Sequence, residues 1–321
     1  MSERKANIRL LLRPALIVLP FVFGALFQCF THCTWQTSGG FNIALWYIRI
    51  VLMVMFYFVL LKIDFKKLIP RKSHALILAA NLAMGLIPYF VLNALGYRNL
   101  ALAAFFVGVT PTANAAAVVM DFLEGKVEYV MTGFVITNVA IDLALIGLIP
   151  LVCGNFTGAF VLDVLCQILL VVAVPLLCAV FTRWICAFFK WKVPRVPGMG
   201  TFLLWSSSLF VIAAQSTRFF QQYSEITWKS ALAVSLISFA ICAVNFTCGK
   251  YLGGMEFARE ASQTLGQKNT TLTIFLALCF GTPEAALGPA SYVLWHNLWN
   301  AFQMYSHDLQ KTSKNPEREL T

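Results

Sequence analysis

The stretch G-Q-K-N-T-T, Gly266 to Thr271, places a glycine, a lysine and two amide side chains inside a segment that is otherwise apolar. The surrounding residues, 257–281, are long enough to cross a membrane, because about 20 helical residues span the hydrocarbon at about 1.5 Å each. Polar groups are tolerated at that depth only where protein or a water-filled cavity satisfies them. The stretch therefore predicts an interrupted membrane helix that lines a site for something polar.

The composition of the whole chain also indicates a membrane protein. Of the 321 residues, 59% are hydrophobic and only 12% are charged, whereas a soluble globular chain has about 25% charged residues. Apolar runs recur throughout and lack the alternating pattern of membrane barrel strands. We therefore predict an all-α polytopic membrane protein with ten transmembrane helices. The ten segments lie near residues 12–30, 41–61, 74–95, 99–123, 127–152, 158–182, 200–217, 230–250, 257–281 and 284–305.

The formal net charge of +10 follows from membrane topology and does not indicate a nucleic-acid partner. If ten spans alternate, nearly all basic residues outside them fall on one side, and the other side has only Arg98, Arg218 and Lys229. By the positive-inside rule we expect both termini in the cytoplasm. The expected partner is the lipid bilayer, whose anionic headgroups attract the basic excess. N-F-T at residues 155–157 matches a glycosylation acceptor, but its loop is short, and a bacterial inner membrane fits the chain better.

Matched interruptions divide the chain into two halves. Pro111 to Ala116, P-T-A-N-A-A, interrupt the fourth segment as Gly266 to Thr271 interrupt the ninth. Since each half has five spans, an odd number, the second half would enter the membrane from the opposite side as an inverted repeat. We predict one repeat over residues 1–155, a second over 156–310 and a cytoplasmic tail over 311–321. Plain kinks are the alternative, because Pro and Gly are frequent in membrane helices. The pairs separated by one common interval are Asn114 and Asn269, Pro20 and Pro175, and Asp142 and Asn297.

The end of the chain resembles a known transporter family. The runs G-Q-K-N-T-T-L, Gly266 to Leu272, and P-E-A-A-L-G-P-A-S-Y-V-L-W-H-N, Pro283 to Asn297, are similar to the last two helices of the bile acid:sodium symporter family. The run G-V-T-P-T, Gly108 to Thr112, together with Gly125, resembles that family's broken fourth helix. The resemblance is most specific over residues 265–300. The chain is identified as a divergent member rather than as a bile acid carrier.

The resemblance implies a fold and a mechanism. Spans one, two, six and seven would form a panel domain, and spans three to five and eight to ten a core domain. The interrupted fourth and ninth helices would cross inside the core. Substrate would bind between the two domains, and rocking of one domain against the other would give alternating access. Members of the family usually couple an organic anion to two sodium ions.

The sodium positions implied by the family are substituted in this chain. Thr264 and Lys268 stand where the family's ninth helix has a glutamate and a glutamine. Apolar residues stand at four further positions where the family has polar ligands. Sodium prefers oxygen ligands, methyl groups supply none, and an ammonium would repel the ion. The sequence therefore puts sodium coupling in doubt. The four apolar positions are Ala116, Ala117, Val130 and Phe134.

Lys268 is the physical substitute for the missing ion. Its ammonium supplies one positive charge and three donors, which could satisfy the carbonyls freed by the broken helices. Because burial disfavours a charged amine, reversible deprotonation could also couple transport to protons. Asp142, in the outward half of the fifth span, is the best acidic partner for Lys268, although it could instead cap a neighbouring helix or line a wet crevice.

The candidate substrate and ion site gathers the polar residues of both interruptions and of the neighbouring spans. Pro111 removes a backbone donor and Gly266 adds permissive backbone geometry. Thr137 and Asn81 are further candidates, and Arg49 could either snorkel or attract an anionic substrate from the crevice. His296 is more consistent with locking a helix than with carrying a proton. The predicted site comprises Lys268, Asn269, Gln267, Thr264, Gly266, Thr110, Pro111, Thr112, Asn114, Asn138, Asp142, His296 and Asn297.

These features predict a secondary carrier of a small organic anion or amphipathic carboxylate that is sodium-independent or proton-coupled. A sodium-coupled, bile-acid-like symporter and a transporter-fold ligand sensor are the alternatives. An intramembrane enzyme is disfavoured, because neither an HExxH nor a GxSxG motif occurs. Nothing in the sequence calls for an organic cofactor or a structural metal. Substrate identity, transport direction, coupling stoichiometry and oligomeric state are left open.

Overall fold

The computed structural model describes residues 19–20, 22–35, 42–62, 65–113, 115–194, 198–222 and 227–314. Within these residues the chain is helical and has no β-strand, as the predicted all-α class requires. A short apolar helix covers Val22–Thr31, and a 3-10 turn, η1 (Phe65–Lys67), precedes α3. The remaining helices are α2 (Ile43–Lys62), α3 (Lys72–Ala94), α4 (Arg98–Gly108), α5 (Ala115–Phe122), α6 (Val127–Cys153), α7 (Gly158–Phe188), α8 (Gly198–Gln222), α9 (Trp228–Leu252), α10 (Ala258–Gly266), α11 (Thr270–Phe280) and α12 (Pro283–Lys314).

The residues at several helix boundaries favour the start or the end of a helix there. The side chains of Thr157 and Thr227 accept hydrogen bonds from the backbone N–H groups at the starts of α7 and α9. Such caps satisfy donors that the first helical turn leaves unpaired. α6 ends at Gly154, whose φ of 71° is left-handed and therefore favours a residue without a Cβ.

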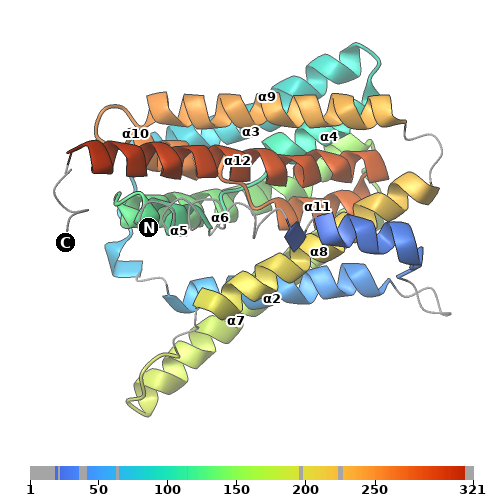
Figure 1. Ribbon diagram of the computed structural model, residues 1–321. Helices are drawn as coiled ribbons and strands as arrows, with labels where there is room; N and C mark the ends of the chain where they lie inside the picture. The colour runs from blue at the N-terminus through green and yellow to red at the C-terminus, as the bar shows by residue number, and fades with distance from the viewer. Residues whose placement is uncertain are drawn as a thin grey trace.

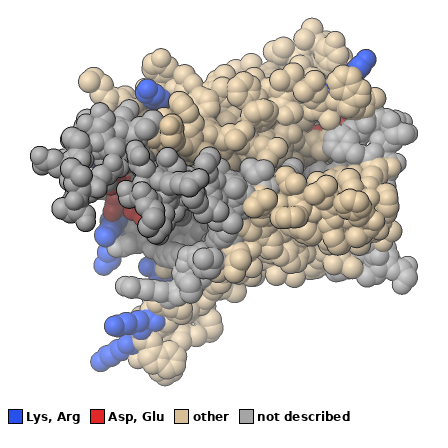
Figure 2. Space-filling model, viewed as in Figure 1, with Lys and Arg blue, Asp and Glu red and all other residues tan. Residues whose placement is uncertain are grey.

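The lengths and surfaces of the helices indicate an integral membrane protein. In the part of the chain that the structure describes, α3, α6, α7 and α9 are each long and apolar enough to cross a membrane. Most of the surface visible in Figure 2 is neither acidic nor basic, and the lysines and arginines on this face lie mainly toward the left end. On α7, the large apolar side chains of Phe181, Trp184 and Phe188 are exposed, as they would be against lipid.

The helices form two groups that lie side by side (Figure 1). In one group, α9 packs against α10 and α12, and α4 packs against α3, α9 and α12. In the other group, α2 packs against α7 and α8. Helix α11 contacts α2 as well as α4 and α12, so it lies where the two groups meet.

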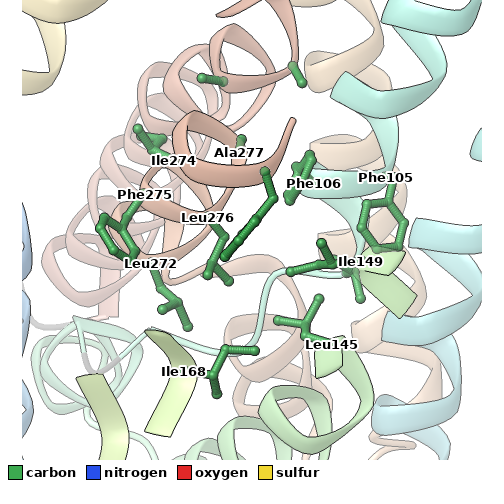
Figure 3. Close-up of a cluster of buried hydrophobic side chains, with 14 of the residues drawn as sticks. Phe105, Phe106, Leu145, Ile149, Ile168, Leu272, Ile274, Phe275, Leu276 and Ala277 are labelled. Carbon is green, nitrogen blue, oxygen red and sulfur yellow. The ribbon is translucent and has the colours of Figure 1, made fainter. Parts of the chain in front are cut away.

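The largest apolar cluster joins the two groups of helices. It combines buried side chains of α2, α4, α6, α7, α8 and α11. Figure 3 labels residues of the cluster from α4, α6, α7 and α11. Lipid tails are as apolar as leucine, so close packing rather than exclusion of water stabilises contacts between membrane helices. The residues labelled in Figure 3 are Phe105, Phe106, Leu145, Ile149, Ile168, Leu272, Ile274, Phe275, Leu276 and Ala277.

Both predicted interruptions are present. Helix α4 ends at Gly108 and α5 begins only at Ala115, with Pro111 between them. Helix α10 ends at Gly266, and α11 begins at Thr270. Pro111 has no N–H to continue a helix. The two breaks leave several backbone groups without partners inside their own helices.

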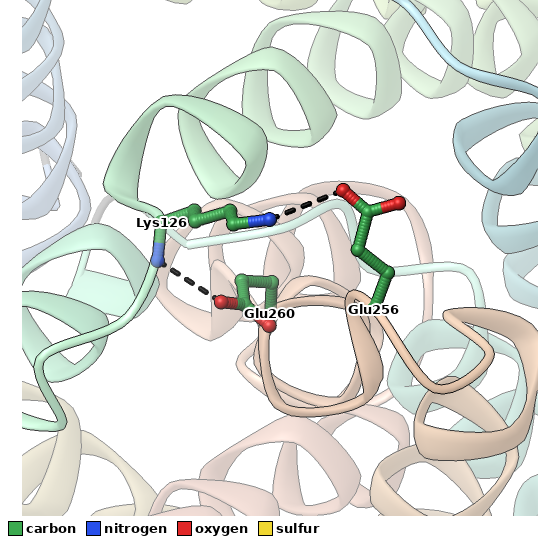
Figure 4. A network of polar contacts seen from close by, with 3 residues as sticks. All are labelled: Lys126, Glu256 and Glu260. Carbon is green, nitrogen blue, oxygen red and sulfur yellow. Dashed lines mark hydrogen bonds and ion pairs between the residues drawn. The ribbon is translucent and has the colours of Figure 1, made fainter.

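Basic and acidic residues gather at one end of the first group. Lys126 Nζ lies 3.1 Å from Glu256 Oε1, and the backbone N of Lys126 donates to Glu260 Oε1 at 3.0 Å (Figure 4). The charged groups of Lys126 and Arg71 both lie over the ring of Phe257. Arg98 donates instead to Val152 O, beside the opposite end of α6. Arg71 and Lys126 thus lie near one end of α6, and Arg98 lies near the other.

The close contact between α3 and α4 depends on the absence of a side chain at Gly108. A Cβ at this position would overlap the backbone carbonyl of Met84. We expect Gly108→Ala to destabilise the protein by about 1–3 kcal/mol, the usual cost of overpacking. Thermal unfolding of the detergent-solubilised protein measures the effect. Gly147→Ala is the matched control, since a Cβ at Gly147 meets no atom within 4 Å, and equal unfolding temperatures for the two variants would contradict the expectation.

Candidate functional site

The two interrupted stretches meet and pair through their backbones. The N–H of Ala113 donates to Gln267 O, and the N–H of Asn269 donates to Pro111 O, both at 2.8 Å. Thr112 and Lys268 form the resulting isolated antiparallel bridge. Backbone groups buried away from water need partners. At this crossing, each broken helix supplies part of what the other lacks.

The Thr112 side chain and carbonyl connect the crossing to α6 and α10. Its Oγ1 donates to Thr264 O at 2.6 Å and accepts from Thr137 Oγ1 at 2.9 Å. The amide of Asn138 donates to Thr112 O at 2.9 Å. All four residues are buried. The structure therefore brings the predicted residues Thr112, Thr264 and Asn138 together, with Thr137 between them.

Thr110 connects the first interruption to α3 and α11. Its Oγ1 donates to Phe106 O and lies 2.9 Å from Thr273 Oγ1. Its carbonyl accepts from Asn81 Nδ2 at 3.1 Å. Asn81 thus belongs to the site, although the sequence offered it only as a further candidate.

Lys268 lies at the centre of this polar layer and is only 1% exposed. Its Nζ donates to Asn81 Oδ1 and, at 3.2 Å, to Gly108 O. Gly108 is the last residue of α4, and the C-terminal end of a helix carries partial negative charge on its free carbonyls. The amine therefore occupies a position where a cation is electrostatically favoured, and it satisfies a carbonyl freed by the break.

A second group of polar side chains surrounds the end of α10. Tyr292 OH donates to Gly266 O at 2.7 Å and accepts from Asn245 Nδ2 at 3.2 Å. Asn300 Nδ2 donates to Gln267 Oε1 at 2.6 Å. The sequence prediction missed Tyr292, Asn245 and Asn300. Asn245 and Asn300 could have been predicted, because they lie inside apolar spans and polar groups in membrane helices usually have a partner.

Gly266 has a different role from the one predicted. Its backbone φ is not left-handed, so the position does not require the permissive geometry of glycine. A Cβ there would overlap the ring of Phe246 instead. Gly266 lets α9 approach the end of α10 closely, and that approach keeps the second interruption packed against the rest of the helices.

The residues at the positions implied for sodium do not fit a sodium ion. Ala116, Ala117 and Val130 are buried in one apolar cluster, and Phe134 is buried in another. The Thr264 hydroxyl is engaged with Glu260 O of its own helix. Across the described ranges there is also no group of three His, Cys, Asp or Glu side chains that could hold a metal. Methyl groups and a lysine amine cannot replace the oxygen ligands that sodium requires.

The proposed pairing of Asp142 with Lys268 is wrong. Among the described residues, Asp142 forms no ion pair, and neither of its carboxylate oxygens has a hydrogen-bond partner. The donors of Lys268 are directed to an amide oxygen and a carbonyl, which satisfy the amine without a carboxylate. The unpartnered oxygens of Asp142 therefore need a separate explanation.

The remaining predicted residues differ in how they relate to the crossing. Asn269 takes part through its backbone N–H, as described above. His296 is buried one turn from Tyr292, and their ring centroids are 5.4 Å apart in an edge-on arrangement. Asn297 is buried and donates to Val293 O of its own helix. Neither His296 nor Asn297 contacts the Thr112–Lys268 bridge through a hydrogen bond in the described structure. Asn114 lies outside the described residues.

Comparison of the chain with models of known protein families gave no match, and comparison with curated proteins also gave none. The resemblance to the bile acid:sodium symporter family therefore rests on the motifs quoted from the sequence.

The hydroxyl of Thr112 should contribute measurably to stability. Thr112→Val keeps the shape of the side chain but removes the donor to Thr264 O and the acceptor for Thr137. We expect a loss of roughly 1–2 kcal/mol, because a buried carbonyl is left unpaired. Thermal unfolding in detergent tests this. Thr31→Val is the control, since the exposed Thr31 hydroxyl donates to Phe27 O of its own helix. A similar loss in both variants would contradict a stabilising role of the Thr112 hydroxyl at the crossing.

Proposed function

We propose that the chain is a secondary carrier of a small organic anion or amphipathic carboxylate, working by alternating access without a bound sodium ion. The observation that carries this proposal is the buried amine of Lys268, which donates to Asn81 and Gly108 where the two interrupted helices meet. Ionisable groups inside membrane proteins are rare and usually serve a pathway or a site.

The amine can perform the structural task of a bound cation. It brings positive charge to the C-terminal end of α4 and donates to a carbonyl that the break has freed. Because it is tethered, it stays in place when the sodium concentration changes. The packing of Ala116, Ala117 and Val130 into an apolar cluster supports the same conclusion, since these side chains offer an ion no oxygen ligands.

Two inverted five-helix repeats account for the order of the helices. Counted from the helix Val22–Thr31, α4 with α5 would make the fourth crossing and α10 with α11 the ninth of the ten that we propose. The helix Val22–Thr31 with α2, α7 and α8 would form the panel domain, and the other helices the core domain, in agreement with the two groups in Figure 1. The end with Arg71 and Lys126 would face the cytoplasm of a bacterium.

A cation beside the boundary between these domains supports an anionic substrate. Arg49 of α2 donates to Gln167 Oε1 of α7 at 2.6 Å, and its guanidinium lies over the rings of Trp46 and of Phe275 in α11. Its buried Nε has no hydrogen-bond partner in the described structure. An arginine with an unused donor suits planar recognition of a carboxylate. This contact favours the crevice role of Arg49 over snorkelling.

Uptake into proteoliposomes tests the proposal directly. A radiolabelled bile acid and a radiolabelled short carboxylate, pyruvate, serve as probes under separately imposed sodium and proton gradients. We expect the parent protein to transport at least one probe equally well with and without sodium. Lys268→Gln should lose most of that transport, because a neutral amide cannot replace the charge at the end of α4. Lys229→Gln, which alters an exposed lysine beside Trp228, is the control.

The outcomes separate the alternatives. Sodium-dependent uptake by the parent together with normal uptake by Lys268→Gln would reject the substitution of an amine for an ion, and would favour the sodium-coupled symporter. Binding of a probe in a thermal-shift assay without any flux would favour a ligand sensor. The Lys268→Gln variant should also unfold at the same temperature with and without sodium, because the apolar positions offer the ion no ligands.

A further inference from the structure

Three buried oxygen atoms on one face of α6 have no hydrogen-bond partner among the described residues. They are the two carboxylate oxygens of Asp142 and the amide oxygen of Asn138. The two side chains are 4% and 5% exposed, and they lie one helical turn apart, a spacing that places side chains next to each other. The amide nitrogen of Asn138 is already used, since it donates to Thr112 O and Phe134 O. The pair therefore offers acceptors and no free donor.

Buried apolar side chains flank Asp142 along α6. Ile141 and Leu145 on either side of it along α6 are 0% exposed and belong to the large apolar cluster. An isolated carboxylate is very costly in such surroundings unless something neutralises it. Among the described residues, no basic side chain lies within ion-pair distance of Asp142.

The charged and titratable groups on the helices packed against α6 are engaged elsewhere. On α3 and α10, His74 contacts Tyr129 O and Glu260 accepts from Lys126 N. Both contacts lie near the start of α6, about 20 Å along the helix from Asp142 at about 1.5 Å per residue. On α7, Asp163 accepts from Gln167 and Arg183 donates to Leu60 O. The other charged side chains are Lys72 on α3, Asp121 on α5 and Arg259 on α10, which lie in the first or last turn of their helices. The other titratable groups are Tyr89 on α3, which donates to Val152 O, and Cys166, Cys178 and Cys186 on α7.

A proton fits these three oxygens better than a metal cation does. Hard cations bound by proteins take about six or more oxygen ligands, and the described side chains here supply three. A proton neutralises the carboxylate without further ligands. It also turns one of the three acceptors into a donor, and the free Asn138 oxygen is an acceptor on the neighbouring side chain one helical turn away.

We propose that Asp142 is held as a neutral carboxylic acid whose O–H donates to Asn138 Oδ1, and that it is the proton carrier of the transport cycle. This inference rests on the proposed function. When the O–H bond breaks, the proton passes to water on the side that is then open, and both bonding electrons stay on the carboxylate. The carboxylate then requires a donor, and the Asn138 amide can supply one by releasing Phe134 O or Thr112 O. Where it releases Thr112 O, the crossing loses a hydrogen bond. Proton release would in this way loosen the crossing that holds Lys268.

Infrared difference spectroscopy of the purified protein tests the protonation state without any transport. We expect the parent to show the carbonyl band of a carboxylic acid, shifted in heavy water, and Asp142→Asn to lack that band. Asp163→Asn is the matched control, because Asp163 is exposed and already has a polar partner on its own helix. Absence of the band in the parent, or its persistence in Asp142→Asn, would overturn the proposal.

Transport in proteoliposomes tests the carrier role with the same variants and the two carboxylate probes. One coupled proton supports about tenfold accumulation across a gradient of about one pH unit. Asp142→Asn should lose this accumulation yet still exchange probe down its own gradient, whereas Asp163→Asn should accumulate it like the parent. Equal accumulation by Asp142→Asn and the parent would refute the carrier role. If the parent transports neither probe, the proposed function and the carrier role fail together, while the infrared band still decides whether Asp142 is a neutral acid.

Discussion

The structure depends on one constraint: backbone groups freed inside a membrane helix must find partners in protein, because lipid supplies none. Two helices are broken at the same place in the molecule, and their free N–H and C=O groups pair across the Thr112–Lys268 bridge. The surrounding threonines and asparagines complete the pairing, so the polar layer at the crossing is a consequence of the breaks as well as a candidate site.

The position of Lys268 and the apolar residues at the implied sodium positions are two aspects of the same arrangement. A mobile ion needs a shell of oxygen ligands, whereas a tethered amine needs only its own acceptors. Asn81 and Gly108 supply those acceptors for Lys268. Ala116 and Val130 can then pack against other apolar side chains without leaving a charge unsatisfied.

Lys268 and Asp142 deal with buried charge in separate ways. The amine is satisfied by neutral acceptors at a helix end, where the helix itself favours positive charge. Among the described residues no donor reaches the Asp142 carboxylate, and a bound proton would remove the cost of its charge. Asn138 donates to Thr112 O and neighbours Asp142 along α6. A change in the protonation of Asp142 could therefore change the hydrogen bonding of Thr112 at the crossing through Asn138.

The sequence by itself determined the apolar helical class, the positions of both interruptions and the presence of Lys268 at the second one, because proline chemistry and apolar length are local properties. Only the tertiary structure decided which groups are partners. It paired Lys268 with Asn81 rather than Asp142, gave Gly266 a packing role against Phe246, and brought Tyr292 and Asn300 to the end of α10. A helix that is apolar all round has no stripe to fix its rotation, so its polar contacts emerge only when the neighbouring helices are packed against it.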